Sequence, residues 1–292
     1  MSTSQPGILA PIPQHARHLT FSLEPGARPR RGLGELSRLA DGERTVAGIG
    51  ESLVRTLGRN IEGLRAFPAQ SGGGLDIPST PSGLWVWIRG KDRGEILHRS
   101  RRIAAALAPA FRLEQVLEAF QHDRSRDLTG YEDGTENPRG AKARKAALVQ
   151  PPSPLAGSSF VAVQQWEHRF DRFDAMSPRS RDDTIGRRRS SNVEIAGAPR
   201  SAHVKRTAQE NFDPPAFVVR RSMPWAEGMR AGLVFLSFGS SLDKFEAQLR
   251  RMLGGDDGIT DALFRFTRPV SGAYFWCPAM RRGRLDLGPL DL

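Results

Sequence analysis

Hydrophobic and polar residues follow one another in an order that occurs once in each half of the chain. Residues 83–90 form an apolar run that predicts a buried strand, and residues 93–107 show apolar side chains at helical spacing. The same order returns with an apolar run at residues 232–239 and a helical pattern at residues 241–253. A strand–turn–helix unit present once per half predicts two similar α+β domains rather than a solenoid.

Shorter segments complete this pattern. Strands are expected at residues 18–23 and 159–166, and a helix is expected at residues 50–58, where the final glycine suits a helix end. Residues 139–154 are rich in Lys, Arg, Ala and Pro and predict a connecting loop.

These elements divide the chain into two domains and a tail. We expect an N-terminal domain over residues 1–140 and a C-terminal domain over residues 141–280. The remaining residues, 281–292, contain Gly288 and Pro289, which disfavour a helix. We therefore expect this tail to be flexible and unpacked.

Composition limits the class of protein. The chain has 292 residues, of which 38% are hydrophobic and 26% charged, and this fits neither a disordered chain nor a membrane protein. It has no run approaching the ~18 apolar residues of a membrane-spanning helix. Its first residues lack the basic stretch and apolar run of a secretory signal, so we expect a cytoplasmic protein.

The net charge of +11 raises the alternative of an arginine-rich protein that binds nucleic acid. The arginines are dispersed and mixed with acidic residues, and the one dense run is Arg187 to Arg189. The distribution therefore argues against a nucleic-acid partner. The sequence also lacks a P-loop, a GxGxxG motif and a serine-hydrolase elbow, which argues against the familiar nucleotide enzymes and serine hydrolases.

Cysteine and histidine usage restricts the kind of metal site. The single cysteine, Cys277, excludes an internal disulfide, a zinc ribbon, an iron–sulfur site and covalent haem attachment through CxxCH. The six histidines form no HxH or HExxH pair. A lone histidine such as His168 or His203 suffices only where the metal brings its other ligands, as haem iron does, and is otherwise a structural residue.

Two further segments carry candidate chemistry. Residues 130–138, GYEDGTENP, combine three acids with two glycines, which is more than a simple Asp-Gly turn requires. Arg220 and Arg221 interrupt an apolar strand, and alternation turns one of them inward. A buried arginine needs a ligand or an acidic partner, whereas an edge strand would leave both arginines in water.

Taken in order, these segments resemble the dye-decolorising peroxidase family, in its compact bacterial branch. Residues 130–138 resemble the GxxDGT signature of that family, and the resemblance covers about residues 5–280. The other matching segments are residues 159–168, 185–187, 201–204, 220–224 and 266–272. The resemblance implies two ferredoxin-like α+β domains with antiparallel sheets, of the dimeric α+β barrel type, and non-covalently bound haem b.

The resemblance also implies roles for individual residues on the side of the haem that carries the axial ligand. His203 would be the axial ligand to the iron, and Asp261 would be the carboxylate that pairs with it. Arg187 would meet a haem propionate.

On the opposite, distal side, Asp133 would be the acid–base group and Arg220 the cation. Glu136 and Ser222 would complete the cofactor site, with Ser222 at a position where some relatives have Asn.

The function implied by the resemblance is that of a haem peroxidase, with hydrogen peroxide as oxidant and a dye, phenolic or other aromatic electron donor. A homo-oligomer is expected. Surface aromatic residues could relay electrons, although core packing also explains them; the candidates are Trp166, Trp225, Trp276, Tyr131 and Tyr274. The alternatives are a haem-handling or iron-release protein of the same fold and the nucleic-acid binder considered above.

Four residues of the tail carry a separate hypothesis. Leu285, Leu287, Gly288 and Leu290 form a Leu-x-Leu-Gly-x-Leu pattern. It resembles the cargo-loading peptides that direct some peroxidases of this branch into encapsulin nanocompartments. Exposed leucines on a flexible strip suit such docking. A disordered tail, or one folded back on its own domain, is the alternative.

Overall fold

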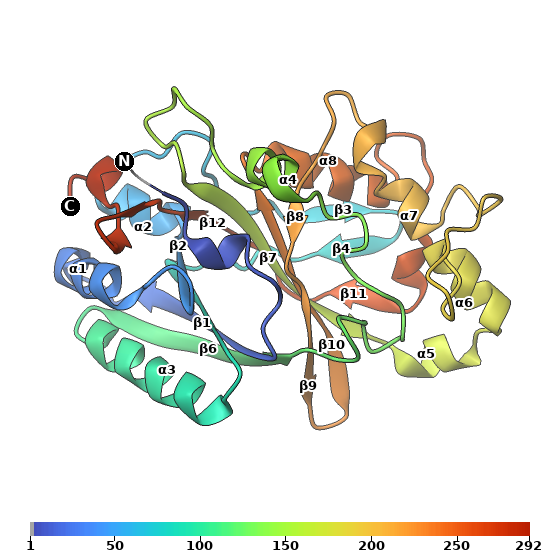
Figure 1. The fold of residues 1–292 in the computed structure, drawn as a ribbon, viewed down its shortest axis with the longest axis horizontal. Coiled ribbons are helices and arrows are strands. Elements are labelled where there is room, and N and C mark those ends of the chain that lie inside the picture. The colour runs from blue at the N-terminus through green and yellow to red at the C-terminus, as the bar shows by residue number, and fades with distance from the viewer. Residues whose placement is uncertain (1–2) are drawn as a thin grey trace.

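The computed structural model describes residues 3–292, whose main strands form one ten-stranded antiparallel sheet through the molecule (Figure 1). The first half contains β1 (His15–Leu23), α1 (Pro29–Leu39), β2 (Thr45–Ile49), α2 (Glu51–Thr56), β3 (Gln70–Gly72), β4 (Leu75–Ile77), β5 (Leu84–Gly90), α3 (Arg93–Leu107) and β6 (Phe111–Phe120).

The second half begins with α4 (Gly140–Ala147), β7 (Ser159–His168), α5 (Phe170–Ala175), α6 (Pro178–Ile185) and α7 (His203–Arg206). It continues with β8 (Val219–Arg220), β9 (Met223–Glu227), β10 (Arg230–Gly239), α8 (Asp243–Met252), β11 (Thr267–Pro269), β12 (Ala273–Cys277), β13 (Met280–Arg281) and β14 (Arg284–Leu285). Short 3-10 helices lie at Pro6–Ile8, Gln209–Asn211, Ala262–Arg265 and Gly288–Leu290.

The strand order identifies the architecture. In space the first half reads β6-β1-β5-β2 and the second half reads β12-β7-β10-β8, so each half has the ferredoxin-like order of fourth, first, third and second strand. The two halves join where β2 pairs with β12, at Ile49 and Trp276, and β9 lies against β6 at the other side. The expected fold class, a pair of ferredoxin-like α+β units, is confirmed. The exact domain boundary at residue 140 stays a prediction.

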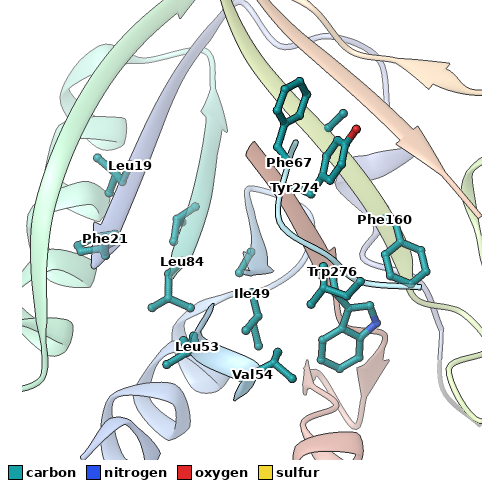
Figure 2. Close-up of a cluster of buried hydrophobic side chains, with 14 of the residues drawn as sticks. Leu19, Phe21, Ile49, Leu53, Val54, Phe67, Leu84, Phe160, Tyr274 and Trp276 are labelled. Carbon is teal, nitrogen blue, oxygen red and sulfur yellow. The ribbon is translucent and has the colours of Figure 1, made fainter. Parts of the chain in front are cut away.

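Both faces of this sheet are buried. Along β5, Leu84, Val86 and Ile88 face the layer of helices, while Trp85 and Trp87 face the opposite side, between the two halves. This double burial explains why the segment is apolar at every position instead of alternating. Figure 2 shows part of the helix-covered core, where side chains of β1, β2, α2, β5 and β12 meet.

Most of the predicted elements are present, with α3 at the expected residues and β1 beginning three residues earlier than expected. The expectation of a connecting loop over residues 139–154 is wrong in its first part, which forms α4. Ala143, Ala146 and Ala147 are buried on one face of that helix. Alanine is the strongest helix former, and this outweighs the basic residues between.

The expectation of a flexible, unpacked tail is also wrong. Strands β13 and β14 pair as a hairpin, and the side chains of Leu285, Leu287 and Leu290 are 4%, 5% and 0% exposed. The chain turns back at Gly283, whose φ of 75° suits glycine, and the leucines pack into the helix-covered core. Ser37 of α1 donates a hydrogen bond to the Leu285 carbonyl at 2.9 Å. The spacing of the leucines is therefore explained by their burial in the core and not by exposure on a docking peptide.

Within residues 3–292 no helix is long and apolar enough to cross a membrane.

Candidate active site

A large cavity lies between the sheet of the second half and α8. It has a volume of about 880 Å³ including its open mouth, which is in the range of cofactor sites. Its apolar walls are Trp166, Leu233, Phe235, Phe245, Leu249, Met252, Leu263 and Phe266. A second hollow of about 870 Å³ adjoins it and shares Asp133, His203, Thr207 and Arg220. The two spaces therefore meet at the predicted chemical groups.

His203 stands at this junction, as the first residue of α7. Its Nδ1 donates to Oδ2 of Asp261 at 2.8 Å, and the Asp261 side chain is 0% exposed. The other oxygen of Asp261 accepts the backbone N–H of Leu263 at 2.8 Å, which fixes the carboxylate. The predicted pairing of His203 with Asp261 is therefore present. It commits the proton to Nδ1 and leaves Nε2 as a free donor of an electron pair.

A second histidine of the cavity differs in this respect. His168, at the end of β7, has partners at both ring nitrogens: Thr267 Oγ1 at 2.7 Å and Asp127 Oδ2 at 2.8 Å. Burial alone would raise the pKa of Asp127, but the charge and hydrogen bond of His168 and two hydrogen bonds from Thr129 lower it overall. Among the described residues that line the cavity, His203 is thus the histidine with a free ring nitrogen.

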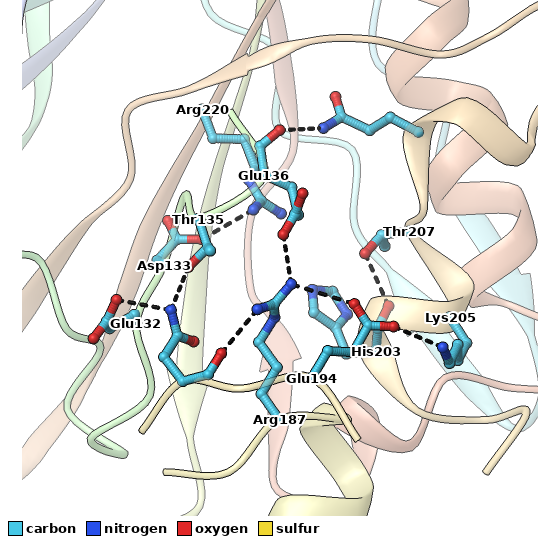
Figure 3. Close-up of polar contacts among 12 residues, drawn as sticks. Glu132, Asp133, Thr135, Glu136, Arg187, Glu194, His203, Lys205, Thr207 and Arg220 are labelled. Atoms are coloured by element: carbon cyan, nitrogen blue, oxygen red, sulfur yellow. Dashed lines mark hydrogen bonds and ion pairs between the residues drawn. The ribbon is translucent and has the colours of Figure 1, made fainter. Parts of the chain in front are cut away.

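Asp133 and Arg220 face each other across the junction (Figure 3). Arg220 Nη2 lies 3.7 Å from Asp133 Oδ1. Asn137 fixes the backbone of Arg220 by accepting its N–H at 2.7 Å and donating to its carbonyl at 3.0 Å. Gly134 has a φ of 77°, which lets the chain turn directly after Asp133. The acidic segment singled out in the sequence is therefore a turn that also presents a carboxylate to the cavity.

Arg187 lies at the mouth of the site and contacts two carboxylates. Its Nη2 donates to Glu136 and lies 3.4 Å from Glu194, while Nη1 donates to the Asn192 carbonyl at 2.9 Å (Figure 3). Lys205 also binds Glu194, at 2.6 Å. Arg187 and Glu136 are therefore brought together, and the two cations at the mouth, Arg187 and Lys205, are paired with carboxylates that an anionic group would have to displace.

Ser222 is the predicted site residue that the structure does not bring to the cavity. Its side chain is buried, at 3% exposure, and it lines neither of the two hollows. On a strand, neighbouring residues point to opposite faces, but β8 ends at Arg220 and the chain leaves the ladder before β9 begins at Met223. The resemblance alone had placed Ser222 at the cofactor site, and this break between the strands turns its side chain away from both hollows.

Sequence reasoning missed Gln164. Its side chain is fully buried in the cavity wall, accepts the indole N–H of Trp166 at 3.2 Å, and leaves its own amide nitrogen without a partner among the described residues. The alternation along β7 could have placed it beside Trp166 on the same face.

The aromatic residues proposed as surface relays are all buried: Trp166, Trp225, Trp276, Tyr131 and Tyr274. The structure therefore supports the alternative of core packing for them. The hydroxyl of Tyr131 donates to Asp182 at 2.6 Å, and burial together with that carboxylate raises its pKa.

Comparison with known proteins gives a consistent result. The family model described as Dyp-type peroxidase, C-terminal, matches residues 124–282, more than half of the chain. A dye-decolorizing peroxidase of Mycolicibacterium paratuberculosis is 29% identical, with 94% of this chain and 83% of that protein covered. A dye-decolorizing peroxidase of Rhodococcus erythropolis is 27% identical, with coverages of 93% and 85%.

Solved structures show the same fold over the whole chain. A dyp-type peroxidase protein of Shewanella oneidensis has a TM-score of 0.89 at 27% identity, and 99% of this chain and 98% of that chain are covered. The dye-decolorizing protein of V. cholerae has a TM-score of 0.84 at 25% identity, with coverages of 93% and 96%.

Proposed function

The chain belongs to the Dyp-type peroxidase family and is a peroxidase, and on this premise we propose that it binds haem b non-covalently beside His203 and uses hydrogen peroxide to oxidise dyes and phenolic donors. The observation that carries the proposal is the free Nε2 of His203, held at the cavity by the buried Asp261.

The lining of the cavity would suit a flat, largely apolar group that is held by one histidine and has an anionic edge. The apolar walls would cover the ring, His203 would hold the iron, and the cations at the mouth would face the propionates. Cys277, the single cysteine, is buried among core residues away from the cavity, which agrees with non-covalent binding. A DypB variant of Rhodococcus jostii, described in complex with heme, shares the fold at a TM-score of 0.85.

Asp261 would act through His203. Its negative charge, shielded from water, keeps the proton on Nδ1 and makes Nε2 a stronger electron donor to a bound metal. Arg187 would bind a propionate, with Glu136 fixing the orientation of its guanidinium.

Asp133 and Arg220 would handle the peroxide. Bound haem would supply an iron centre that can give two electrons to hydrogen peroxide as the O–O bond breaks. Breaking that bond unequally requires a proton to move from one peroxide oxygen to the other, and a carboxylate such as Asp133 can carry it. Arg220, whose guanidinium lies 3.7 Å from that carboxylate, would stabilise negative charge that develops on the departing oxygen.

The test is an absorption spectrum of purified protein and its peroxide-dependent oxidation of a dye. We expect a Soret band in the wild type, and its loss or displacement in His203→Ala with loss of activity. His98→Ala, at an exposed position of α3, is the matched control and should change neither. A normal Soret band with full activity in His203→Ala would contradict the assignment.

The haem-handling alternative needs His203 and Arg187 but not Asp133. In Asp133→Asn, peroxide turnover should collapse while haem stays bound. Peroxide turnover no faster than that of free haem in the wild type, and unchanged in Asp133→Asn, would favour haem handling. Absence of a Soret band together with salt-dependent binding to polyanions would favour the nucleic-acid binder instead.

We also propose, separately, a homo-oligomer and packaging in an encapsulin shell. The support for packaging is the fold shared with the encapsulated DyP-type peroxidase from Mycobacterium smegmatis, at a TM-score of 0.85. The buried tail opposes it, because Leu285, Leu287 and Leu290 would have to leave the core to reach a shell wall. Co-expression with an encapsulin tests packaging, comparing the full chain with one that ends at Arg282, and equal co-purification of both would exclude the tail as the signal. Sedimentation tests the oligomer.

A further inference from the structure

A second large cavity lies on the opposite face of the sheet from His203, between the two ferredoxin-like halves. Its volume is about 1170 Å³ including its opening. Its inner walls come from both halves and consist of His18, Trp85, Leu117, Val163, Val234, Ala273 and Phe275. We call this space the inter-half cavity.

The inter-half cavity and the active-site cavity share one wall. Along β7, Gln164 and Trp166 line the active-site cavity, while Val163 and Gln165 line the inter-half cavity. Strand β10 repeats this, because Val234 faces the inter-half cavity and its two neighbours face the active site. Since successive residues of a strand point to opposite faces, a single layer of backbone separates the two spaces.

His18 gives the inter-half cavity its chemical character. The side chain is 4% exposed, and both ring nitrogens are buried without a hydrogen-bond partner among the described residues. It stacks near Trp85 and Trp87, with ring centroids 5.9 and 6.2 Å away, and the indole nitrogen of Trp85 is also unpartnered. Burial lowers the pKa of His18 to about 3, so the ring is neutral. A neutral imidazole offers one donor and one acceptor, and the indole adds a donor.

Unpartnered polar atoms this deep in an apolar wall indicate a ligand that supplies both an acceptor and a donor. A hydroxyl group does both. The aromatic rings of Trp85 and Phe275 suit a flat ring attached to it.

The residues at the rim of the inter-half cavity favour entry of neutral molecules over anions. It is formed by neutral polar side chains and one carboxylate: Thr20, Ser22, Thr80, Ser82, Gln115, Gln165, Ser271 and Glu114. Gln115 of β6 donates to Gln165 of β7 at 3.2 Å, which links the two halves at the opening. No arginine or lysine is among the described lining residues. Glu114 is itself paired with Arg112 at 2.8 Å, so an anionic molecule would find no available cation among the described residues that line the cavity.

We propose that the inter-half cavity binds a neutral phenol as an electron donor, which rests on the peroxidase function proposed above. Two phenols would each lose one electron and one proton, and one hydrogen peroxide would become two water molecules, leaving two phenoxyl radicals. The electrons cross the β7–β10 wall to the active site, and the protons leave at the polar rim. Sulfonated dyes do not enter and react elsewhere.

A bulky substitution in β1 that fills the inter-half cavity tests the proposal through the rates of substrate oxidation. Thr20 lies opposite Trp85 on the neighbouring strand and away from the active-site wall, so Thr20→Phe occupies the space. We expect kcat/KM for 2,6-dimethoxyphenol to fall at least tenfold while oxidation of a sulfonated azo dye continues. Thr56→Phe, at an exposed position of α2, is the matched control and should affect neither substrate. Unchanged phenol oxidation, or equal losses with both substrates, would overturn the proposal.

Direct binding separates this proposal from the peroxidase proposal. Crystals soaked in 4-bromophenol should show an anomalous bromine signal beside His18, and 4-bromobenzenesulfonate should give none there. In solution, 4-bromophenol should quench tryptophan fluorescence with a Kd that weakens at least fivefold in His18→Phe, which keeps the ring and removes its nitrogens. Bromine found only in the active-site cavity, or nowhere, would overturn the proposal. Absence of haem or of all peroxidase activity would instead refute the proposed function. The binding measurements would still show whether a phenol occupies the inter-half cavity.

Discussion

Replacing His18 by Phe should make the protein less sensitive to acid. In the folded chain the imidazole is buried beside Trp85 and Trp87, and burial lowers its pKa from 6.5 to about 3. In the unfolded chain the same group has its ordinary value of about 6.5. Between these two values the unfolded chain binds a proton that the folded chain does not bind. Stability is therefore lost as the pH falls from about 6.5 towards 3.

The magnitude follows from the distance below the unfolded pKa. One pH unit in this interval corresponds to about 1.4 kcal/mol per group. At pH 5 the unfolded state gains about 2 kcal/mol from protonation of His18, whereas at pH 7 the gain is close to zero. His18→Phe removes this contribution. Its free energy of unfolding relative to the wild type should therefore rise by about 2 kcal/mol between pH 7 and pH 5.

The assay is urea unfolding followed by circular dichroism at the two pH values, with both proteins carrying the same haem content. The difference in free energy of unfolding between variant and wild type is measured at pH 7 and again at pH 5. Comparing these two values cancels any effect of the substitution on packing that does not depend on pH. His98→Phe, at an exposed site, is the control and should show no such change. The same stability difference at pH 7 and pH 5 in His18→Phe would refute the view that the folded chain holds a neutral imidazole in the inter-half cavity.

Three further changes test the active site and the tail. Asp261→Asn should keep the shape of the pair with His203 but lose its charge, and haem affinity or turnover, measured by titration and steady-state kinetics, should fall about 10–100-fold. Dye oxidation should be retained at acid pH instead of being lost below pH 7, because the proposed proton carrier, Asp133, is a carboxylate and not an imidazole; a rate that rises steadily through pH 7 would contradict this. Leu290→Ala removes a fully buried side chain and should lower the free energy of unfolding by about 2–5 kcal/mol in urea titrations, whereas an effect near zero would indicate an unpacked tail.

The repeated order of strand and helix could be predicted from the sequence because each unit buries both faces of a strand. Continuous apolar runs and helical spacing are local signals, and they predict a helix at residues 93–107, where α3 lies. The tail could not be predicted in the same way. Its leucines look exposed in a segment with Gly288 and Pro289, and only the core surface beside α1 and α2 shows that they are buried.

Contacts between distant residues were the harder part of the site. The pairing of His203 with Asp261 spans 58 positions and came from family resemblance rather than from any spacing rule. The pairing of His168 with Asp127 spans 41 positions and left no pattern in the sequence at all. Arg220 illustrates the intermediate case, because alternation predicted one inward arginine but could not name its partner, Asp133.

The common wall of the two cavities limits how this chain can change over evolutionary time. Inserting or deleting a single residue within β7 would reverse the direction of every side chain beyond that point. Gln164 and Trp166 would then point between the halves, and Val163 and Gln165 would point towards His203. A substitution in β7 thus changes the lining of one cavity only, whereas an insertion or deletion changes the lining of both cavities at once. Among descendants of this sequence, loops should vary in length while the length of β7 stays constant.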